Sequence, residues 1–600
     1  MDRNSAIGMT LIAGLLMVYF YFFSTPPIPP STVKTDSIAA VQKIAGIAQK
    51  PVAKFDSTAI QSYGSLGSFL QGKEELINIE NSDLRVAVSS NGYIKNLELK
   101  NFKTYSQKPL FLIENGNNLF SLIAQYGGKD VDLYQLFYKV ETAKRGDSTV
   151  LTLSANVGEN GFIKHIYSIK NSGFMVGYKI ASSGLTFTKE NISFQWVNPI
   201  ALQEKDMADS RTKTTVGYFL SNGEYDNLGE SADPKEQLFA NSVKWVSIRQ
   251  KFFISSIIAQ NNFSGGEVKM STDTNDPAVV RTAEAELFIP AADVKNNKAT
   301  FQYYFGPNDY DIITKVTTGF EENLSLGWPP MSWINRFVII PVFHFLEKYL
   351  NNYGLIIILL VLMVKIVLLP LSYTSYLGMA KMKLLKPEMD IIKEKNGDNM
   401  AQNQQDTMKL YKQVGVNPFS GCIPLILQMP ILFAMFYFFP IAIGLRQKQF
   451  LWAEDLSTYD SVLNLPFTIP FYGAHVSLFV LLMTISTLIY TWQNNQISSV
   501  AGPMKSMSYI MPIVLVFVLN SFSAGLSFYY FVSNLITFAQ QAIIKRFVDE
   551  DKIKALMEEN KKKAAISGPG KKSKFMTKLE EAMKASEEAR KTSETKKKKK

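Results

Sequence analysis

A lysine inside an apolar run is the residue of this sequence that most needs a chemical explanation. Lys365 interrupts LIIILLVLMVKIVLLPL, the segment from Leu355 to Leu371, which holds no other charged side chain. A charge near the centre of a membrane-spanning helix costs about 2.5–3.5 kcal/mol on insertion scales. Either the ammonium group reaches the membrane surface along its alkyl chain, or it lies in a wet, polar cavity where it attracts anionic groups.

Other groups that commonly perform chemistry are scarce in this chain. It has one cysteine, Cys422, so no disulfide can form within it. Three histidines stand in separate segments: His165, His344 and His475. No zinc motif such as CxxC or HExxH is present. The stretch GSFLQGKE resembles a phosphate-binding loop, but Glu74 replaces the Ser or Thr that binds magnesium. We therefore predict a protein that is not an enzyme and uses no metal or cofactor.

Polar side chains on the later apolar runs could share a cavity with Lys365. They are Gln428, Thr484, Ser486, Thr487, Ser527, Tyr529, Tyr530, Ser533 and Asn534. Hydroxyl and amide groups also join helices to one another in lipid, so a structural role is the alternative for each. A cluster that includes a cation is more informative, because charges inside a membrane usually mark substrate paths.

The elements that carry these residues are runs of membrane length, about 17–25 residues. Five follow residue 353: roughly Gly354–Ser372, Gly421–Leu445, Ala474–Thr491, Ser506–Phe522 and Ala524–Lys545. A further run, Ile7–Phe23, follows Arg3 and ends in aromatic residues rather than in the small residues of a cleavage site. It predicts an uncleaved signal anchor, with a cleaved signal peptide as the alternative. The sequence thus predicts a polytopic α-helical membrane protein with six transmembrane helices.

The charges of the connecting segments predict the orientation of these helices. The loop at 376–418 carries seven lysines, whereas the loop at 446–471 has two basic residues beside three acidic ones. From Ala542 onward the chain has 19 Lys and Arg against 10 Asp and Glu. Because cytoplasmic loops carry the excess of basic residues, we predict that the first loop and both termini are cytoplasmic. A basic tail suits an anionic membrane surface or RNA, and a merely solvated tail is the alternative.

Residues 76–326 alternate with a period of two, which is typical of strands. Strand pairs are predicted around the turns Asn91-Gly92 and Asn171-Ser172-Gly173. These patterns predict one antiparallel β-sandwich outside the cytoplasm. The segment Trp333–Leu350 is amphipathic and is predicted to lie in the membrane interface. A buried helix of the soluble domain is the alternative.

The charged cytoplasmic loop predicts a hairpin of two helices, about Leu377–Lys395 and Met400–Val414. The first helix carries three methionines: Met379, Met382 and Met389. Flexible thioethers suit a surface that meets varied apolar partners, which favours substrate contact. Packing of the hairpin seam is the alternative for the same side chains.

Three stretches of the chain resemble the YidC/Oxa/Alb family of membrane protein insertases in its Gram-negative form. They are MAKMKLLKPEMD (Met379–Asp390), VNPFSGCIPLILQMPI (Val416–Ile431) and AGLSFYYFVSNLITFAQQ (Ala524–Gln541). In the external region, WVSIRQKFF (Trp245–Phe253) and YFGPNDYD (Tyr304–Asp311) are similar to motifs of the same family. The resemblance covers nearly the whole chain between the linker and the tail.

The resemblance implies a hydrophilic groove that five spans enclose and that opens to the cytoplasm and to lipid. Lys365 stands where Gram-negative members usually have arginine, and lysine keeps the charge without the bidentate fork. Gln428 and Tyr530 match groove positions, and Asn534 and Thr484 complete the predicted substrate groove. Ser523 stands where the family usually has proline, which predicts a looser turn there.

The family also implies a β-supersandwich outside and a cytoplasmic hairpin that receives substrate. The implied partners are nascent membrane proteins, components of the Sec translocon, membrane lipids and, through the basic tail, the ribosome. The implied location is the bacterial inner membrane, as a multi-pass protein with a periplasmic β domain. The implied function is to insert, fold and help assemble integral membrane proteins, alone or with the translocon. A polytopic transporter or channel with an external β domain is the alternative.

The resulting domain prediction has six parts. They are a signal anchor at 1–25, a flexible linker at 26–75, the periplasmic β domain at 76–326, an interfacial amphipathic helix at 327–353, a five-helix insertase core at 354–546 with its hairpin at 376–418, and a basic tail at 547–600.

Overall fold

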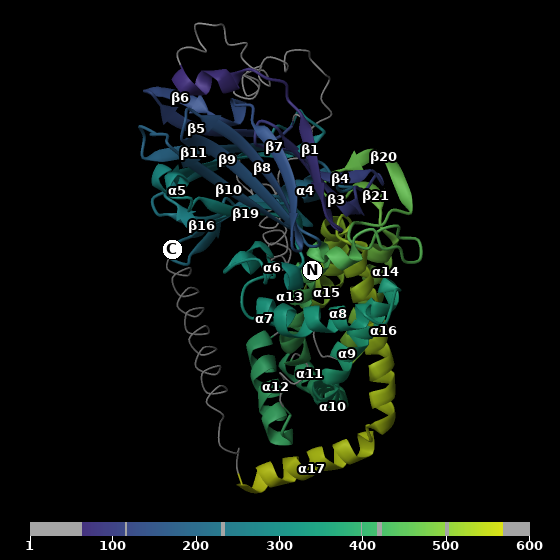
Figure 1. Cartoon of the computed structure of the whole chain (residues 1–600). Coiled ribbons are helices and arrows are strands. Elements are labelled where there is room, and N and C mark those ends of the chain that lie inside the picture. The colour runs from purple at the N-terminus through teal and green to yellow at the C-terminus, as the bar shows by residue number, and fades with distance from the viewer. Residues whose placement is uncertain are drawn as a thin grey trace, which may run out of the picture.

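The computed structural model describes residues 63–567, apart from 115–116, 230–233, 398, 417–422 and 498–502. The predicted signal anchor, most of the linker and most of the basic tail lie outside these residues. Figure 1 shows a β-rich part at one end of the molecule and a helical part at the other. The hairpin helices and α17 lie at the far end from the sheets (Figure 1).

Two large antiparallel sheets make up most of the β-rich part. The nine-stranded sheet has the order β13-β12-β15-β16-β19-β10-β9-β8-β7. Its strands are β7 Lys139–Arg145, β8 Ser148–Val157, β9 Gly161–Lys170, β10 Met175–Ser183, β12 Thr215–Leu220, β13 Tyr225–Asn227, β15 Val243–Arg249, β16 Phe253–Phe263 and β19 Thr300–Pro307. The six-stranded sheet has the order β14-β17-β18-β11-β5-β6. Its strands are β5 Leu119–Tyr126, β6 Lys129–Asp132, β11 Asn191–Ala201, β14 Lys235–Phe239, β17 Gly266–Ser271 and β18 Val279–Pro290.

A smaller sheet and short helices complete this part. Four strands pair in the order β1-β2-β3-β4: Leu76–Glu80, Leu84–Ser89, Ile94–Lys103 and Pro109–Ile113. The short helices are η2 Gly64–Leu70, η3 Leu133–Gln135, α4 Met207–Lys213, α5 Ala291–Lys295, α6 Tyr310–Ile313 and η4 Phe320–Asn323.

The two large sheets pack face to face, as the predicted β-sandwich requires. Residues of β11 alternate between buried and partly buried positions along the strand, so that one face meets the core. Across the core, the ring of Trp196 on β11 lies 6.3 Å from the ring of Phe305 on β19. Both predicted turns are confirmed: β2 pairs with β3, β9 pairs with β10, and Gly92 and Gly173 have φ of 96° and 95°. Those positive φ values are the conformations that glycine adopts without steric cost.

The helical part begins with a continuous helical segment at the base of the sandwich. It consists of α7 Met331–Ile334, the π turn η5 Asn335–Ile339 and α8 Ile340–Glu347. One side of it is buried, including Ile340 and Phe343. The other side exposes Phe337, Phe345 and Tyr349 by 76%, 53% and 72%. The segment is therefore apolar on both sides, as a helix lying between protein and lipid would be.

The remaining helices occupy the predicted apolar runs and the hairpin. They are α9 Tyr353–Val367, α10 Leu369–Leu384, α11 Lys386–Asn396, α12 Met400–Val414, α13 Ile423–Phe438, α14 Leu478–Ile497, α15 Pro503–Leu519, α16 Ala524–Phe547 and α17 Glu550–Ser567. Two 3-10 turns follow α13, namely η7 Phe439–Ile441 and η8 Ile443–Leu445. The strands β20 Leu463–Ile469 and β21 Gly473–Val476 form a hairpin before α14.

The predicted boundaries of the first core span, Gly354–Ser372, and of the first hairpin helix, Leu377–Lys395, were wrong. The chain bends by 62° between α9 and α10, and a second break at Leu385 separates α10 from α11. Pro370 and Pro387 stand in the first turns of α10 and α11. Proline removes a backbone donor and clashes with the carbonyl four residues earlier, so it ends or bends the preceding helix. Leu377–Lys395 is therefore divided between two helices, whereas α12 has the predicted bounds.

A helix that crosses a bilayer needs about 20 mostly apolar residues. Among the described residues, no single helix is both long enough and apolar enough to cross a bilayer, and the bent pair α9 with α10 passes that test when taken together.

Candidate functional site

Lys365 lies in the last turn of α9, where it joins α9 to α16. Its side chain is 5% exposed. The ammonium Nζ donates a hydrogen bond to Thr537 Oγ1 over 2.9 Å. In return, Gln540 Nε2 donates to the backbone carbonyl of Lys365 over 3.0 Å. Within the described part of the chain, no carboxylate forms an ion pair with this ammonium, so its positive charge is buried without a counter-ion.

The bend after α9 explains why the carbonyl of Lys365 is available. α9 begins at the cap of Asn352, whose side chain accepts a hydrogen bond from the N–H of Leu355, and ends at Val367. The last four carbonyls of a helix have no partner within the helix, and that of Lys365 is among them. The amide of Gln540 satisfies this carbonyl. The chain bends between α9 and α10, three residues after Lys365, so the predicted span Gly354–Ser372 does not continue straight beyond this lysine.

The next contacts along α16 join it to α14. Asn534 Nδ2 donates to Ser486 Oγ and Thr487 Oγ1 over 2.9 and 3.0 Å. Thr484 is 7% exposed, and its hydroxyl donates to the carbonyl of Val480 in its own helix over 2.8 Å. Asn534 therefore links two helices, and the hydroxyl of Thr484 is used within α14.

On its other side α16 faces α13. Of the two remaining predicted residues, Tyr530 is on α16 and Gln428 is on α13. The hydroxyl of Tyr530 donates to the carbonyl of Leu432 over 3.2 Å. Gln428 is partly buried on α13. Among the described residues, neither side chain forms a hydrogen bond with Lys365. The structure thus brings Lys365 beside polar residues of α16 and places Tyr530 at the contact with α13, while Gln428 is partly buried on α13.

Thr537 and Gln540, which form hydrogen bonds with Lys365, were not among the predicted site residues. A signal for them was present, since Asn534, Thr537 and Gln540 follow one another at intervals of three. Residues three and four apart lie on one face of a helix. Extending the predicted polar face of α16 by two turns would have included both.

The methionines of the hairpin divide into two groups. Met382 and Met389 are partly buried and pack against a small cluster that includes Leu385, Leu410 and Ile553. The Tyr411 hydroxyl donates to the sulfur of Met389 over 3.4 Å. Met379 is partly buried on α10. In this conformation, Met382 and Met389 fill the seam between the hairpin and α17.

Comparison with known proteins identifies the family. The model of the 60Kd inner membrane protein family matches residues 345–552, and that of the YidC periplasmic domain matches residues 76–340. A membrane protein insertase YidC from Amoebophilus asiaticus is 42% identical over 596 residues, which cover 98% of this chain and 99% of that protein. A second one, from Cytophaga hutchinsonii, is 44% identical over 614 residues, with 98% of both chains covered. The chain belongs to the YidC family of membrane protein insertases.

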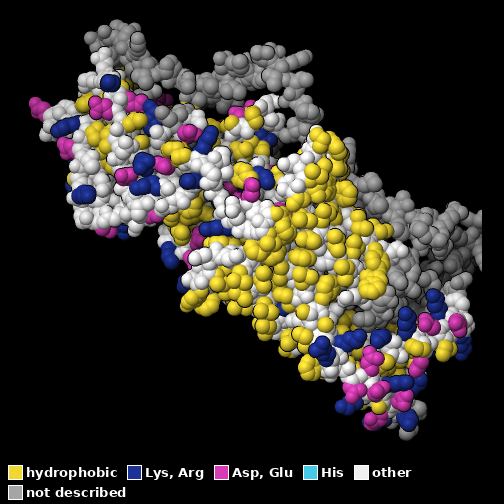
Figure 2. Space-filling view, turned by 90° about the vertical axis from the view of Figure 1, so that its right-hand side faces the viewer, with side chains coloured by type: hydrophobic (Ala, Val, Ile, Leu, Met, Phe, Trp, Pro, Cys, Tyr) yellow, Lys and Arg dark blue, Asp and Glu magenta, His cyan; other side chains and the backbone are white. Residues whose placement is uncertain are grey.

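The surface of this YidC family member changes character between its two ends. Figure 2 shows apolar side chains covering the helical part, with charged side chains gathered on the sheet part and at the opposite end. Exposed members of the apolar surface include Leu362, Ile366, Ile489, Trp492 and Ile513. Soluble proteins rarely expose so large a continuous apolar area. A belt of this kind, bounded by charge on both sides, fits a lipid environment.

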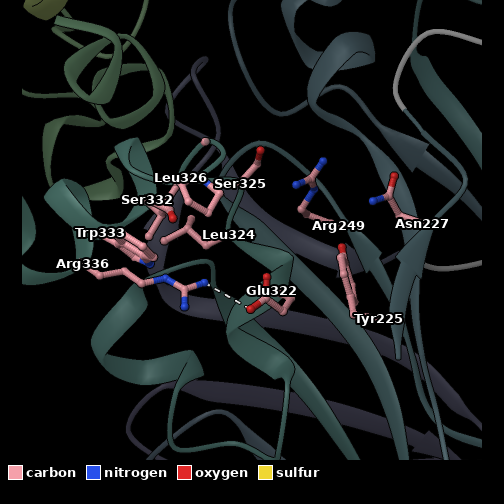
Figure 3. Close-up of a pocket in the computed structure, with 12 residues that line it drawn as sticks. Tyr225, Asn227, Arg249, Glu322, Leu324, Ser325, Leu326, Ser332, Trp333 and Arg336 are labelled. Atoms are coloured by element: carbon pink, nitrogen blue, oxygen red, sulfur yellow. Dashed lines mark hydrogen bonds and ion pairs between the residues drawn. The ribbon is translucent and has the colours of Figure 1, made fainter. Parts of the chain in front are cut away.

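A cavity of about 750 Å³ lies where the sandwich meets α7, at the outer end of the helices. Strand residues such as Tyr225 and Arg249 line one side, and Trp333 and Arg336 line the other (Figure 3). Arg336 Nη2 pairs with Glu322 Oε1 over 3.2 Å. No residue that lines this cavity was predicted from the sequence to be functional, and Lys365 is not among the lining residues.

Proposed function

We propose that this protein inserts integral membrane proteins into the bacterial inner membrane. Family membership supports this function, because the relatives from Amoebophilus asiaticus and Cytophaga hutchinsonii carry the name of membrane protein insertase. The observation in this molecule that carries it is Lys365, a buried cation that pairs with no described carboxylate and lies beside a polar face of α16. A buried, uncompensated cation favours the arrival of an anionic group.

The proposed membrane arrangement has six spans. The helices α13 to α16 and the bent pair of α9 with α10 form the five-helix core, and Ile7–Phe23 is the sixth span. α14 and α16 have 20 and 24 residues, which at 1.5 Å per residue amount to roughly 30–36 Å. Loop charge places the hairpin and both termini in the cytoplasm and the β domain in the periplasm. The opposite positions of hairpin and sandwich in Figure 1 support this orientation.

The proposed mechanism lowers the barrier that a polar segment meets on its way across the membrane. Lys365, Gln428, Thr484, Tyr530 and Asn534 form the substrate groove, open to the cytoplasm. An acidic segment of the substrate enters, attracted by the ammonium of Lys365. The apolar segment next to it slides along the helices and moves sideways into lipid. Because the groove shortens the apolar path, the segment loses less hydration on the way.

The driving force is proposed to be partitioning together with the membrane potential. The potential contributes about 2.3 kcal/mol per elementary charge per 100 mV. Since the cytoplasm is negative, the potential favours the outward movement of acidic residues. No nucleotide is required by this scheme.

The cytoplasmic elements are proposed to receive the substrate. Met379, Met382 and Met389 would contact an apolar segment once the hairpin separates from α17, because two of them now lie in that seam. The basic tail at 547–600 suits ribosomal RNA or anionic lipid. Cooperation with the Sec translocon belongs to the same proposal.

Reconstitution tests this function directly. Proteoliposomes containing the full chain would receive a single-span substrate with an acidic external tail, and tail protection from protease would be measured. We expect protection with the wild-type chain and with Lys365→Arg, and loss of most of it with Lys365→Ala. Lys139→Ala is the matched control, since Lys139 is an exposed lysine of the sandwich. Protection equal to that of empty liposomes with the wild-type chain would refute the function.

A further inference from the structure

In the external segment between α13 and α14, most charged side chains are buried and many large apolar side chains are exposed. Residues 446–476 contain five charged side chains, of which Arg446, Asp455 and Asp460 are buried. Large apolar side chains are instead exposed: Leu451 68%, Trp452 36%, Val462 47%, Leu463 57%, Phe467 61% and Phe471 61%. A loop that met only water would have the reverse arrangement.

The buried charges have partners, so the connection is held in place. Arg446 Nε donates to Glu204 Oε1 of the sandwich over 2.9 Å, and its Nη2 donates to the carbonyl of Lys103 over 2.6 Å. Asp460 accepts hydrogen bonds from the N–H groups of Leu478 and Phe479 at the start of α14. The outward direction of the apolar side chains is therefore a property of an anchored segment.

The sequence of β20 alternates with a period of two, although its pairing with β21 shifts register between Asn464 and Ile469. Leu463, Leu465, Phe467 and Ile469 alternate with Asn464, Pro466 and Thr468. Successive side chains of a strand point to opposite faces, so one face of β20 is apolar and the other is polar or proline. No Asp, Glu, Lys or Arg occurs from Ser461 to Ile497. A two-stranded sheet of this kind is only marginally stable in water on its own.

Two of the exposed apolar residues have a backbone conformation that disfavours them. Leu451 and Phe471 have φ of 53° and 65°, in the left-handed region where glycine or asparagine is usual. A strained backbone of this kind persists only where the surrounding structure holds it in place. Both residues stand at turns, and both project their side chains outward, with 68% and 61% exposed.

The apolar face of the hairpin is continuous with the apolar surface of the helices. Asn520, just after α15, donates to the carbonyls of Tyr472 and His475 over 2.9 and 2.7 Å. The ring of Tyr472 lies 5.6 Å from that of Phe517 on α15, which is itself 44% exposed. In Figure 2 the apolar surface of the helical part continues upward beside the sheet part, at the height where Figure 1 places β20 and β21.

We propose that the β20–β21 hairpin, with its neighbour Leu451, inserts its apolar side chains into the outer leaflet of the lipid bilayer. Phe467 and Phe471 are the deepest contacts, and the polar face with Thr468 remains toward water. The hairpin anchors the external ends of α14 and α15 laterally, on a part of the chain away from Lys365. This inference rests on the membrane orientation in the proposed function.

Site-directed spin labelling tests the inference in the full chain in nanodiscs. Single cysteines replace Phe467, Thr468, Leu362 or Leu238 in a Cys422→Ser background, and a nitroxide is attached to each. Accessibility to oxygen, which concentrates in lipid, is compared with accessibility to a nickel chelate, which stays in water. Leu362 on α9 reports the membrane belt, and Leu238 on β14 is an apolar residue 69% exposed on the sandwich.

We expect Phe467→Cys to favour oxygen several-fold, as Leu362→Cys does, and Thr468→Cys and Leu238→Cys to favour the nickel chelate. A water-like signal at Phe467 beside a lipid-like signal at Leu362 would overturn the inference and leave the proposed function intact. A label at Phe467 that neither reagent reaches would show a protein partner on the hairpin and would also overturn it. A water-like signal at Leu362 would refute the membrane arrangement itself.

Discussion

At the scale of single residues, Lys365 combines burial, a hydroxyl partner and a positive charge that pairs with no carboxylate in the part of the chain that the structure describes. Its contacts come from α16, with Thr537 and Gln540 lying 172 and 175 residues further along the chain. The sequence predicted the cation itself, because a lysine within an apolar run is visible locally. The spacing of Asn534, Thr537 and Gln540 indicates a polar face of α16, but the sequence does not show that this face packs against α9.

His165 provides a second prediction at the residue scale. It is fully buried between β-sandwich tyrosines, with its Nδ1 2.8 Å from the hydroxyl of Tyr178. Burial lowers the pKa of His165 to about 3, whereas an unfolded histidine titrates near 6.5. Between these values the unfolded chain binds one proton more than the folded chain. Folding stability should therefore be lost as the pH falls below about 6.5.

The variant His165→Phe should lose this part of the pH dependence. The contribution of one proton is at most about 1.4 kcal/mol per pH unit. Calorimetry of the full chain between pH 7 and pH 4 measures this contribution. The unfolding temperature is plotted against pH, and the slope for the variant is compared with the slope for the wild type. Parallel slopes would show that His165 is accessible to protons in the folded protein.

At the scale of elements, the hairpin strands of the sandwich were predictable and the breaks in the helices were less so. The turns at Gly92 and Gly173 follow from local residue types, and the structure confirms both. Pro370 and Pro387 also carry a local signal, but the apolar pattern around them continues through the breaks, so one long span and one long helix were predicted. These helix boundaries depend on the backbone hydrogen bonds that proline removes, and a hydropathy pattern carries no information about those bonds.

Ser523 allows a prediction about the turn between α15 and α16. Its φ is −59°, close to the value that proline imposes. The turn is held by the N–H groups of Ala524 and Gly525, which donate to Thr458 and Leu456 over 2.7 and 2.9 Å. The looser turn expected from the absence of proline stays a prediction. Ser523→Pro should stabilise the chain by about 0.4–1 kcal/mol, because the unfolded state loses freedom.

The unfolding temperature in detergent is the measurement for this substitution. Ser521→Pro is the comparison variant in the same turn, and we expect it to lower that temperature. A fall with Ser523→Pro as large as that of the comparison would contradict the reading of its backbone.

The docking of α17 on the hairpin supplies another prediction. Ile553 and Met557 are buried in the hairpin cluster, while Lys383–Glu550 and Lys561–Glu388 are ion pairs with largely exposed side chains. Burial of a large aliphatic side chain contributes about 1.5–3 kcal/mol, and an exposed ion pair contributes about 0.2–1 kcal/mol. Ile553→Asp should therefore release α17, and Lys561→Ala should not.

Amide hydrogen exchange in α17 and α12 would follow this release. We expect faster exchange in both helices with Ile553→Asp and little change with Lys561→Ala. If the lysine variant alone accelerated exchange, charge rather than apolar contact would hold α17.

At the scale of the whole molecule, the ion pair of Arg446 and Glu204 ties the sandwich to the helical part. The two side chains are 4% and 12% exposed. Removing one partner of such a buried pair costs about 3–5 kcal/mol, because it leaves the other charge uncompensated. Arg446→Ala should destabilise the chain by that amount, and the double variant Arg446→Met with Glu204→Leu should recover much of it. Unfolding in denaturant measures the free energy of unfolding of the wild type and of both variants. If the single and the double variant lose the same free energy of unfolding, lost packing rather than an uncompensated charge is the cause.

The central claim is that the charge of Lys365 selects the segment that crosses the membrane. The most direct measurement is insertion into proteoliposomes without a membrane potential, using wild type and Lys365→Glu with substrates that differ only in an acidic or a basic external tail. We predict that the wild-type chain protects the acidic tail several-fold better than the basic one, and that Lys365→Glu reverses this preference. The same preference in both chains, or equal insertion of both tails, would contradict the claim.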